Sequence, residues 1–156
     1  MKSRVMLLVA GLSLCSFTAL AAAKLKPFQK EAQKKFDEEV AAPLAAANTA
    51  CGSKLTVKTN FDAYKEDEWS GQSISARCES VLNAVAAVCA KEAYKEELVA
   101  NIKEVQCLFG GKPGDNNEKT KVNMSVTGKA FVFKMHATNV NLQELAQQVI
   151  EKKLNE

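Results

Sequence analysis

The fold depends on the stretch from Ser75 to Ala90, which reads SARCESVLNAVAAVCA. Its larger apolar residues recur three or four positions apart, as in an amphipathic α-helix, at Cys78, Val81, Leu82, Val85, Val88 and Cys89. Alanines fill much of the remaining surface, so we expect this helix to pack against neighbours on two sides. Beyond Lys91 the apolar stripe changes phase, which predicts a bend near residues 90–93 and a second, shorter helix ending near Lys103.

The two cysteines of this helix cannot bond to each other. Cys78 and Cys89 are eleven residues apart, which is about 16 Å along a continuous helix, whereas a disulfide needs Cα atoms roughly 4.4 to 6.8 Å apart. Each must therefore pair with Cys51 or Cys107, so the helix is tied at one end to each of them. The favoured pairing is Cys51 with Cys78 and Cys89 with Cys107, and the pairing of Cys51 with Cys89 and Cys78 with Cys107 stays open.

Disulfides are expected because the amino-terminal segment, residues 1–23, reads as a cleaved signal peptide. A basic start with Lys2 and Arg4 precedes an apolar run, and small residues lead to a cleavage site predicted after Ala23. A retained anchor is disfavoured because the apolar run is interrupted and short. Lipidation at Cys15 is disfavoured because a leucine precedes that cysteine. The protein is therefore predicted to be exported, to the periplasm or the extracellular space, where thiols oxidise.

The predicted mature region, residues 24–156, has the composition of one globular domain. The chain is 47% hydrophobic and 25% charged, which are ordinary values for such a domain. Cleavage would remove two of the 21 basic residues, so the mature region would have one more basic residue than the 18 acidic ones. The overall charge therefore favours no particular partner, and no transmembrane helix is expected in the mature region.

The other predicted elements complete an α+β domain. In chain order they are a helix over 24–50 that Pro43 should kink or split, a strand over 54–61, a loop over 62–73 with Trp69 folded onto the core, a strand over 105–109, a hairpin over 121–136 and a helix over 141–154. This order, α-β-α-(α)-β-β-β-α, predicts a mainly antiparallel four-stranded sheet covered on one face by helices.

The hairpin has a predicted register, with Thr127-Gly128 as its two-residue loop. The facing pairs are then Val126 with Lys129, Met124 with Phe131, and Val122 with Phe133. The opposite face would carry Lys121 directly beside Lys134. If the strand over 54–61 joins this sheet, the open face would become basic.

A hypothesis of an anion-binding face follows, made up of Lys54, Lys58, Lys121 and Lys134. Its ligand would be an acidic protein, an acidic glycan or a lipid headgroup. The competing interpretation is that these lysines keep an open sheet face soluble. Nucleic acid is not expected, because export removes the protein from the cytoplasm and no aromatic residues interleave with these lysines.

The sequence carries no pattern that assigns catalysis, a cofactor or a metal. His136 is the one histidine, and no nucleophile or phosphate-binding motif accompanies it. The acidic groups at 37–39, 66–68 and 115–118 show no spacing that selects a catalytic pair or a calcium loop. The cysteine spacings of 27, 11 and 18 residues from Cys51 onward do not match a zinc site.

Three classes of function remain. The leading hypothesis is a small exported, non-catalytic binding or inhibitor-like module. The second is an envelope-associated structural protein that docks through its amphipathic amino-terminal helix. The third is a hydrolase with an unrecognised site. Whether the protein is an enzyme is left open, with the absence of a motif favouring a non-catalytic role.

Overall fold

The computed structural model describes residues 24–156, so the predicted signal peptide lies outside the described residues. This part folds into an α+β structure with a four-stranded sheet and five α-helices. The elements in chain order are α1 (Pro27–Cys51), β1 (Thr56–Lys58), the short 3₁₀-helix η1 (Phe61–Ala63), α2 (Ile74–Cys89), α3 (Glu92–Asn101), β2 (Glu104–Phe109), α4 (Asn117–Lys121), β3 (Met124–Thr127), β4 (Ala130–Met135) and α5 (Leu142–Leu154). Helix α1 continues through Pro43 and is not split there.

The sheet has the strand order β1-β2-β4-β3 and is mixed. Strand β2 runs parallel to both β1 and β4, and β3 alone is antiparallel to its neighbour. The prediction of a mainly antiparallel sheet was therefore wrong. The chain passes through α2 and α3 between β1 and β2, and a helical crossover of this kind returns it to the same end of the sheet and yields a parallel pair. Alternating apolar residues identify a strand face but carry no information on strand direction.

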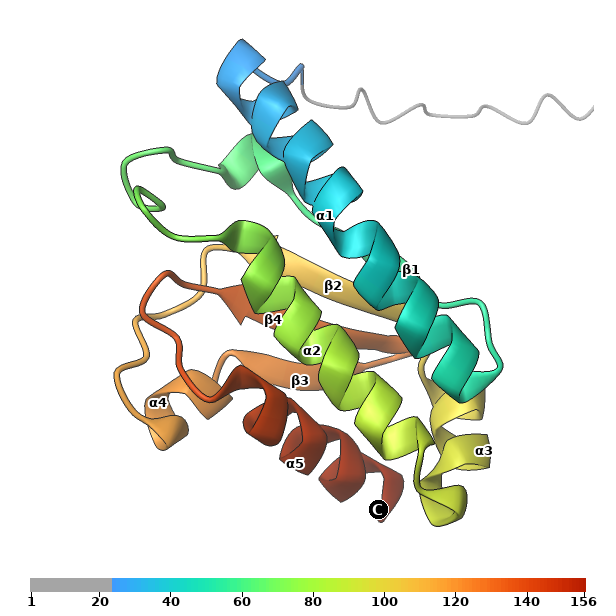
Figure 1. Cartoon of the computed structure of the whole chain (residues 1–156). Helices are drawn as coiled ribbons and strands as arrows, with labels where there is room; N and C mark the ends of the chain where they lie inside the picture. Colours follow the sequence, from blue (N-terminus) through green and yellow to red (C-terminus); the bar gives the residue numbers. More distant parts are fainter. Residues whose placement is uncertain (1–23) are drawn as a thin grey trace, which may run out of the picture.

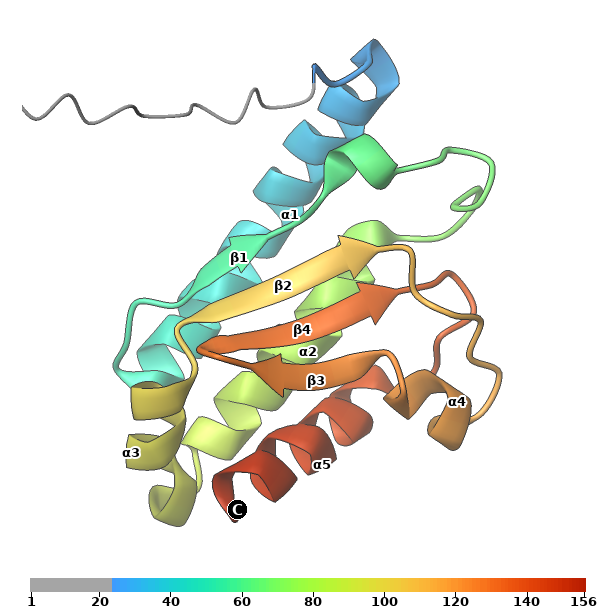
Figure 2. The ribbon, with the colours of Figure 1, turned by 180° about the vertical axis from the view of Figure 1, so that it is seen from behind.

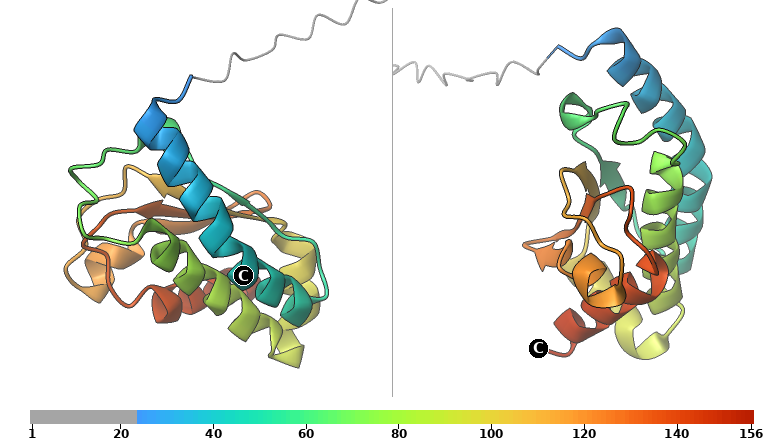
Figure 3. Two further views of the ribbon diagram at one scale, coloured as in Figure 1. Left: turned by 45° about the horizontal axis from the view of Figure 1, so that its top comes forward. Right: turned by 90° about the vertical axis from the view of Figure 1, so that its left-hand side faces the viewer.

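The helices lie on one face of the sheet, as predicted. Helices α1, α2 and α5 cross in front of the strands in Figure 1, and from behind the four strands face the viewer uncovered in Figure 2. The edge-on view in Figure 3 shows these two layers side by side. We call the uncovered side of the sheet the bare face. None of the helices in residues 24–156 combines the length and the apolar character that a membrane crossing needs.

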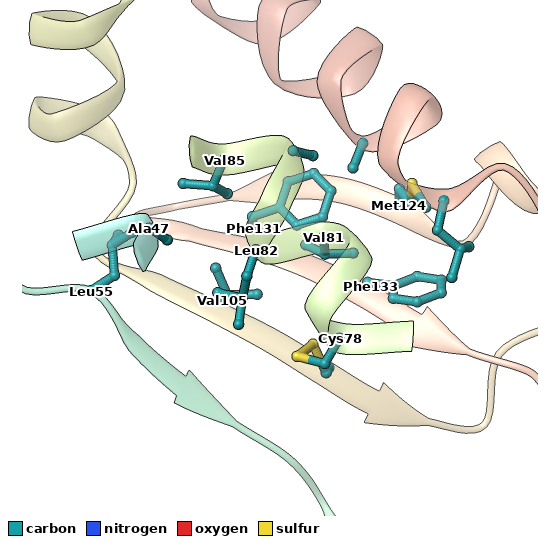
Figure 4. Close-up of a cluster of buried hydrophobic side chains, with 14 of the residues drawn as sticks. Ala47, Leu55, Cys78, Val81, Leu82, Val85, Val105, Met124, Phe131 and Phe133 are labelled. Atoms are coloured by element: carbon teal, nitrogen blue, oxygen red, sulfur yellow. A yellow bond between two sulfur atoms is a disulfide. The ribbon is translucent and has the colours of Figure 1, made fainter. Parts of the chain in front are cut away.

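The core forms between α2 and the central strands, as its apolar stripe predicted. Val81, Leu82 and Val85 are fully buried and point toward the sheet (Figure 4). Phe131 and Phe133 of β4 lie beside them and are also fully buried (Figure 4). Ser73 precedes helix α2, and its hydroxyl accepts a hydrogen bond from the N–H of Ala76 and so caps the helix.

Two disulfides connect α2 to the rest of the fold. Cys51 bonds Cys89 with a Cα–Cα distance of 5.0 Å, and Cys78 bonds Cys107 of β2 at 5.8 Å. The favoured pairing of Cys51 with Cys78 and Cys89 with Cys107 was therefore wrong, and the pairing left open is the one formed. The reason is visible in Figure 1: α1 and α2 run in the same direction, so their carboxyl ends lie together.

The hairpin forms in a register two residues away from the predicted one. Its facing pairs are Met124 with Phe133, Ser125 with Val132, Val126 with Phe131, and Thr127 with Ala130. The loop is consequently Gly128-Lys129, and Gly128 takes the positive φ of +57° that such a tight turn needs. A shift of two residues keeps every side chain on its predicted face, which is why apolar alternation did not detect it.

The first part of the predicted hairpin is not a strand. Residues from Asn117 to Lys121 form helix α4, because the side chain of Asn116 accepts a hydrogen bond from the N–H of Lys119 and caps it. Val122, which was predicted to face Phe133 in the core, is 70% exposed. Lys121 therefore does not lie opposite Lys134.

Candidate binding groove beside an edge strand

The four lysines of the hypothesised anion-binding face do not gather on one surface. Lys134 is exposed on the bare face, and Lys58 lies on the same face in β1. Lys58 is already paired, because its Nζ lies 2.5 Å from a carboxylate oxygen of Glu104. Lys121 belongs to α4, where its Nζ donates to Oε1 of Gln148 at 3.3 Å. Lys54 is exposed ahead of β1.

The bare face as a whole is more neutral than predicted. Strand alternation places ten side chains on it, namely Thr56, Lys58, Glu104, Gln106, Leu108, Ser125, Thr127, Ala130, Val132 and Lys134. Only three of these are charged, and two of the three form the pair between Lys58 and Glu104. Anion binding at this face stays a prediction.

His136 and the acidic turn after β2 are engaged in local structure. The Nδ1 atom of His136 lies 2.9 Å from the hydroxyl of Thr138, and its backbone N–H donates to Oδ1 of Asn139 at 2.8 Å. Asp115 pairs with Lys119 at 2.9 Å, and this hydrogen-bonded lysine holds the pKa of Asp115 below its usual value. No group of three metal-ligating side chains occurs within residues 24–156.

A groove lies between α1 and the edge strand β1, with a volume of about 440 Å³. Its floor is apolar and comes from both elements: Phe36, Val40 and Leu44 lie on α1, and Val57 lies on β1. The full lining is Gln33, Phe36, Asp37, Val40, Ala41, Leu44, Val57, Lys58, Thr59 and Phe61. We call this feature the α1–β1 groove. Its neighbour β1 is the edge strand farther from α5 in Figure 2.

One backbone pair of β1 points toward the free edge of the sheet. The N–H of Thr56 donates to the carbonyl of Lys103 at 3.2 Å, on the β2 side. In a parallel ladder, alternate residues direct both backbone groups to the same neighbour. Thr56 and Lys58 therefore bond to β2, whereas Val57 directs its N–H and its C=O away from β2 and toward the edge.

The residue before this pair is already satisfied by a side chain of α1. Asn48 accepts a hydrogen bond from the N–H of Leu55 at 2.6 Å and donates one to the carbonyl of Leu55 at 3.3 Å. A carboxamide presents the same acceptor and donor as a peptide unit, so Asn48 pairs with Leu55 as a neighbouring strand would. Val57 is the next residue along β1 that faces the same edge, and it borders the groove.

The polar groups of the groove leave one free charge, and it is negative. Asp37 is an exposed residue that makes no ion pair within the described chain, and partial withdrawal of its carboxyl group from water raises the pKa of that group. The only lysine of the lining, Lys58, is held by Glu104. The hydroxyl oxygen of Thr59 is buried and finds no hydrogen-bond partner among residues 24–156.

An aromatic cluster fixes the far end of the groove. Phe61 contacts Phe36 and Phe109 with ring centroids 5.5 Å apart in both cases, and Trp69 packs on Phe109 at 5.5 Å. Trp69 is 5% exposed, so its predicted folding back onto the core is confirmed. These contacts hold η1 against α1 and thereby set the position of Thr59.

Sequence reasoning identified part of this groove. The alternation of Leu55, Val57 and Thr59 predicted a strand with one buried side, and the amphipathic helix over 24–50 supplied the apolar residues of α1. The pairing of Asn48 with Leu55 gave no signal in the sequence, because a single asparagine near a helix end has many uses. The edge position of β1 also depends on the strand order. Comparisons with protein-family models, with curated proteins and with solved structures find no match for this chain.

Proposed function

We propose that the protein is a non-catalytic binding module that takes an extended peptide segment of a partner protein into the α1–β1 groove. The observation that carries this proposal is the outward backbone pair of Val57, placed beside an apolar groove of about 440 Å³. Addition of a strand to a free sheet edge is a common mode of peptide recognition, in which main-chain hydrogen bonds give affinity and side-chain pockets give specificity.

The backbone of β1 limits where such a segment binds. Asn48 occupies the edge at Leu55, so the segment pairs from Val57 toward Thr59. By the same alternation, the backbone of Thr59 faces the edge and is the next polar group that the segment reaches. A short segment of about three residues covers this length at about 3.3 Å per residue.

The side chains of the groove define the chemistry of the segment. Because successive side chains of a strand alternate, every second residue would enter the floor formed by Phe36, Val40 and Leu44, and these positions should be apolar. The unpaired carboxylate of Asp37 favours a lysine or arginine at a residue near the rim. The expected occupant is therefore an extended segment with alternating apolar residues and a basic one.

Export of the protein is part of the proposal. The two disulfides support it, since cytosolic proteins usually keep their thiols reduced. The predicted signal peptide over residues 1–23 points the same way. The proposed partner is then met in the periplasm or outside the cell.

A different explanation of β1 exists, namely that the edge is only protected. Short edge strands flanked by lysines resist edge-to-edge aggregation, and Lys54 and Lys58 flank Val57. This explanation accounts for the lysines but gives no role to the apolar groove, to the unpartnered Thr59 hydroxyl or to the lone Asp37. The two explanations differ in whether a peptide binds.

The proposal is tested by selecting binders from a displayed library of random twelve-residue peptides, with the protein (residues 24–156) as the immobilised target. We expect selected peptides to alternate apolar and polar residues and to carry a lysine or arginine. Substitution Val57→Pro removes the outward N–H, which bonds nothing within β1 and β2, and should weaken the selected peptide about fivefold, since a lost hydrogen bond is worth about 1 kcal/mol. Edge strands tolerate proline where the N–H faces outward.

The matched control is Val126→Pro on the opposite edge strand. The N–H of Lys134 donates to the carbonyl of Asn123, so the alternation of the antiparallel ladder leaves the backbone groups of Val126 pointing outward, as in Val57. This variant should keep full affinity. The exposed substitution Asp37→Lys gives a second test, because it should remove the preference for basic residues without affecting folding. Equal affinity of the parent protein, V57P and D37K would refute the proposal.

A further inference from the structure

A second site, separate from the α1–β1 groove, surrounds the one arginine of the described chain. Arg77 lies on α2 and is partly buried. Its Nη2 atom donates to the carbonyl of Ala137 at 2.6 Å and to Oε1 of Gln72 at 3.0 Å. Both acceptors are neutral, and no carboxylate of residues 24–156 lies within ion-pairing distance of the guanidinium.

This arrangement leaves a positive charge without a counter-ion. A guanidinium stays protonated at any physiological pH, and a charge withdrawn from water is stabilised when an opposite charge approaches it. Burial lowers the pKa of Arg77, which is consistent with the cost of keeping the cation there. The Nε atom is buried and has no hydrogen-bond partner within the described residues. Both bonds to neutral acceptors leave from Nη2, and Nη1 makes no hydrogen bond within residues 24–156.

Arg77 lines a hollow of about 510 Å³ between α2 and the start of α5. The lining is Arg77, Ser80, Asn139, Val140, Asn141, Leu142, Gln143, Glu144 and Gln147. We call it the Arg77 hollow. Arg77 is the only cationic residue of this lining. The hydroxyl of Ser80 already donates to the carbonyl of Ala76 within α2.

The amino end of α5 opens into the same hollow without a side-chain cap. Asn141, at the capping position, has a positive φ of +52°, and its side chain donates to Asn117 instead of accepting from the first turn of α5. The first N–H groups of a helix have no partner inside the helix and carry partial positive charge. They add their partial positive charge to that of Arg77 in the same hollow.

One group opposes an anion in this position. Glu144 lines the hollow, and its carboxylate accepts a hydrogen bond from Nε2 of Gln148 at 3.2 Å. Its negative charge complements the first turn of α5 and therefore competes with any bound anion. Removing the charge of Glu144 should therefore raise the affinity for an anion. A purely structural role of Arg77 would not produce this increase.

We infer that the Arg77 hollow binds a small oxyanion, a phosphate or carboxylate group, through Arg77 and the first turn of α5. The remaining nitrogen of the guanidinium, Nη1, can donate a charge-assisted hydrogen bond to such a group, and backbone N–H groups at a helix start bind the same chemistry. The site is independent of the peptide groove, because it is built by α2 and α5 and shares none of the residues that line the groove.

Titration of isotope-labelled protein (residues 24–156) with inorganic phosphate tests this site by NMR at constant ionic strength. We expect saturable shifts at the amides of Leu142, Gln143 and Glu144, with binding at least tenfold weaker in Arg77→Gln. Glu144→Gln should bind phosphate several-fold more tightly. Lys134→Gln, on the bare face, is the matched control and should leave the affinity unchanged. A parallel titration with acetate distinguishes a phosphate preference from a carboxylate preference.

Two results would overturn the inference. One is a linear response spread over the lysines of the surface, which indicates general screening. The other is an affinity that E144Q does not raise, and this result decides the matter even if R77Q fails to fold. Because the titration involves no peptide, its failure leaves the proposal for the α1–β1 groove intact.

Discussion

The two edge strands of the sheet share one local feature and differ in their surroundings. Val57 in β1 and Val126 in β3 are both partly buried, both pack their side chains on the core, and both direct their backbone groups outward. Strand β3 is joined to its neighbour by the tight turn at Gly128 and lies close to α4 and α5 (Figure 2). Strand β1 borders the groove of α1, where Asn48 already takes the place of a strand.

The difference shows that an open backbone pair is not enough for recognition. Every sheet edge has unpaired groups, and most are only protected from aggregation. At β1 the open pair coincides with an apolar floor, an unpaired carboxylate at Asp37 and an unpartnered hydroxyl at Thr59. Variants that affect both edges, or only one of them, show how much the open backbone pair and its surroundings each contribute to stability and to peptide binding.

The largest effect is expected from the residue that lies between the two edges. Phe131 is fully buried and faces Val105 of β2 on one side and Val126 of β3 on the other. Phe131→Ala should lower the free energy of unfolding by about 3 to 5 kcal/mol, because it removes a large buried side chain and leaves a cavity. Val132→Ala, one residue along on the bare face, should cost less than about 1 kcal/mol. Urea unfolding measures both, and similar losses would contradict the assignment of faces.

Removing either disulfide should lower the stability by a similar amount, but only one of the two removals should lower the affinity for the selected peptide. The bonds close loops with sequence separations of 38 and 29 residues, so replacing either pair by serine should cost about 2 to 4 kcal/mol. Loss of Cys51–Cys89 should also weaken the selected peptide, because this bond fixes the end of α1 that carries Asn48. Loss of Cys78–Cys107 should leave the peptide affinity unchanged. Equal effects on affinity would show that the position of α1 does not matter.

A smaller effect is expected from Asn48 itself. Asn48→Ala leaves the N–H and the C=O of Leu55 without their partner and should cost about 1 to 2 kcal/mol. The next residue supplies the control: the exposed Thr49 bonds only within α1, so Thr49→Ala should be nearly neutral. Thermal unfolding compares the two variants. If N48A is as stable as T49A, the side chain does not act as a strand neighbour.

The smallest effect concerns the ion pair of the β1 edge. Hydrogen bonds from Lys58 and from Gln106 lower the pKa of Glu104 below the usual value of a glutamate. The contribution to stability is therefore present above about pH 4.5 and is lost as the pH falls through the lowered pKa. Glu104→Gln should cost less than about 1 kcal/mol at pH 7, since Lys58 is 66% exposed. The difference from the parent protein should shrink at acid pH in urea titrations. In a Lys58→Gln background the substitution should cost less than in the parent protein.

The parts of this fold that follow a local period could be predicted from the sequence. The stripe of α2, with Val81, Leu82 and Val85, repeats every three to four residues whatever it packs against, and it was confirmed. Strand direction could not be predicted, because alternation is the same in parallel and antiparallel strands. The register of the hairpin was missed because a shift of two residues preserves the faces of Met124 and Phe133.

Features that depend on relations between distant elements were also missed. The pairing of Cys51 with Cys89 follows from two helices running in the same direction, which no local sequence pattern records. The candidate sites depend on single polar residues, Asn48 and Arg77, whose roles arise from the segments that the fold brings beside them. The predicted pairing of Lys121 with Lys134 failed for a local reason, because Lys121 lies in helix α4 and not in a strand.

Hydrogen exchange at three successive amides of β1 tests the central claim most directly. In the free protein Thr56 and Lys58 should be protected by their bonds to β2, while Val57 should exchange nearly as fast as an unstructured chain. Saturating amounts of the selected peptide should protect Val57 and leave Val126 on the other edge unchanged. Protection of Val57 in the free protein, or unchanged exchange of Val57 when the peptide is bound, would contradict the proposed strand addition.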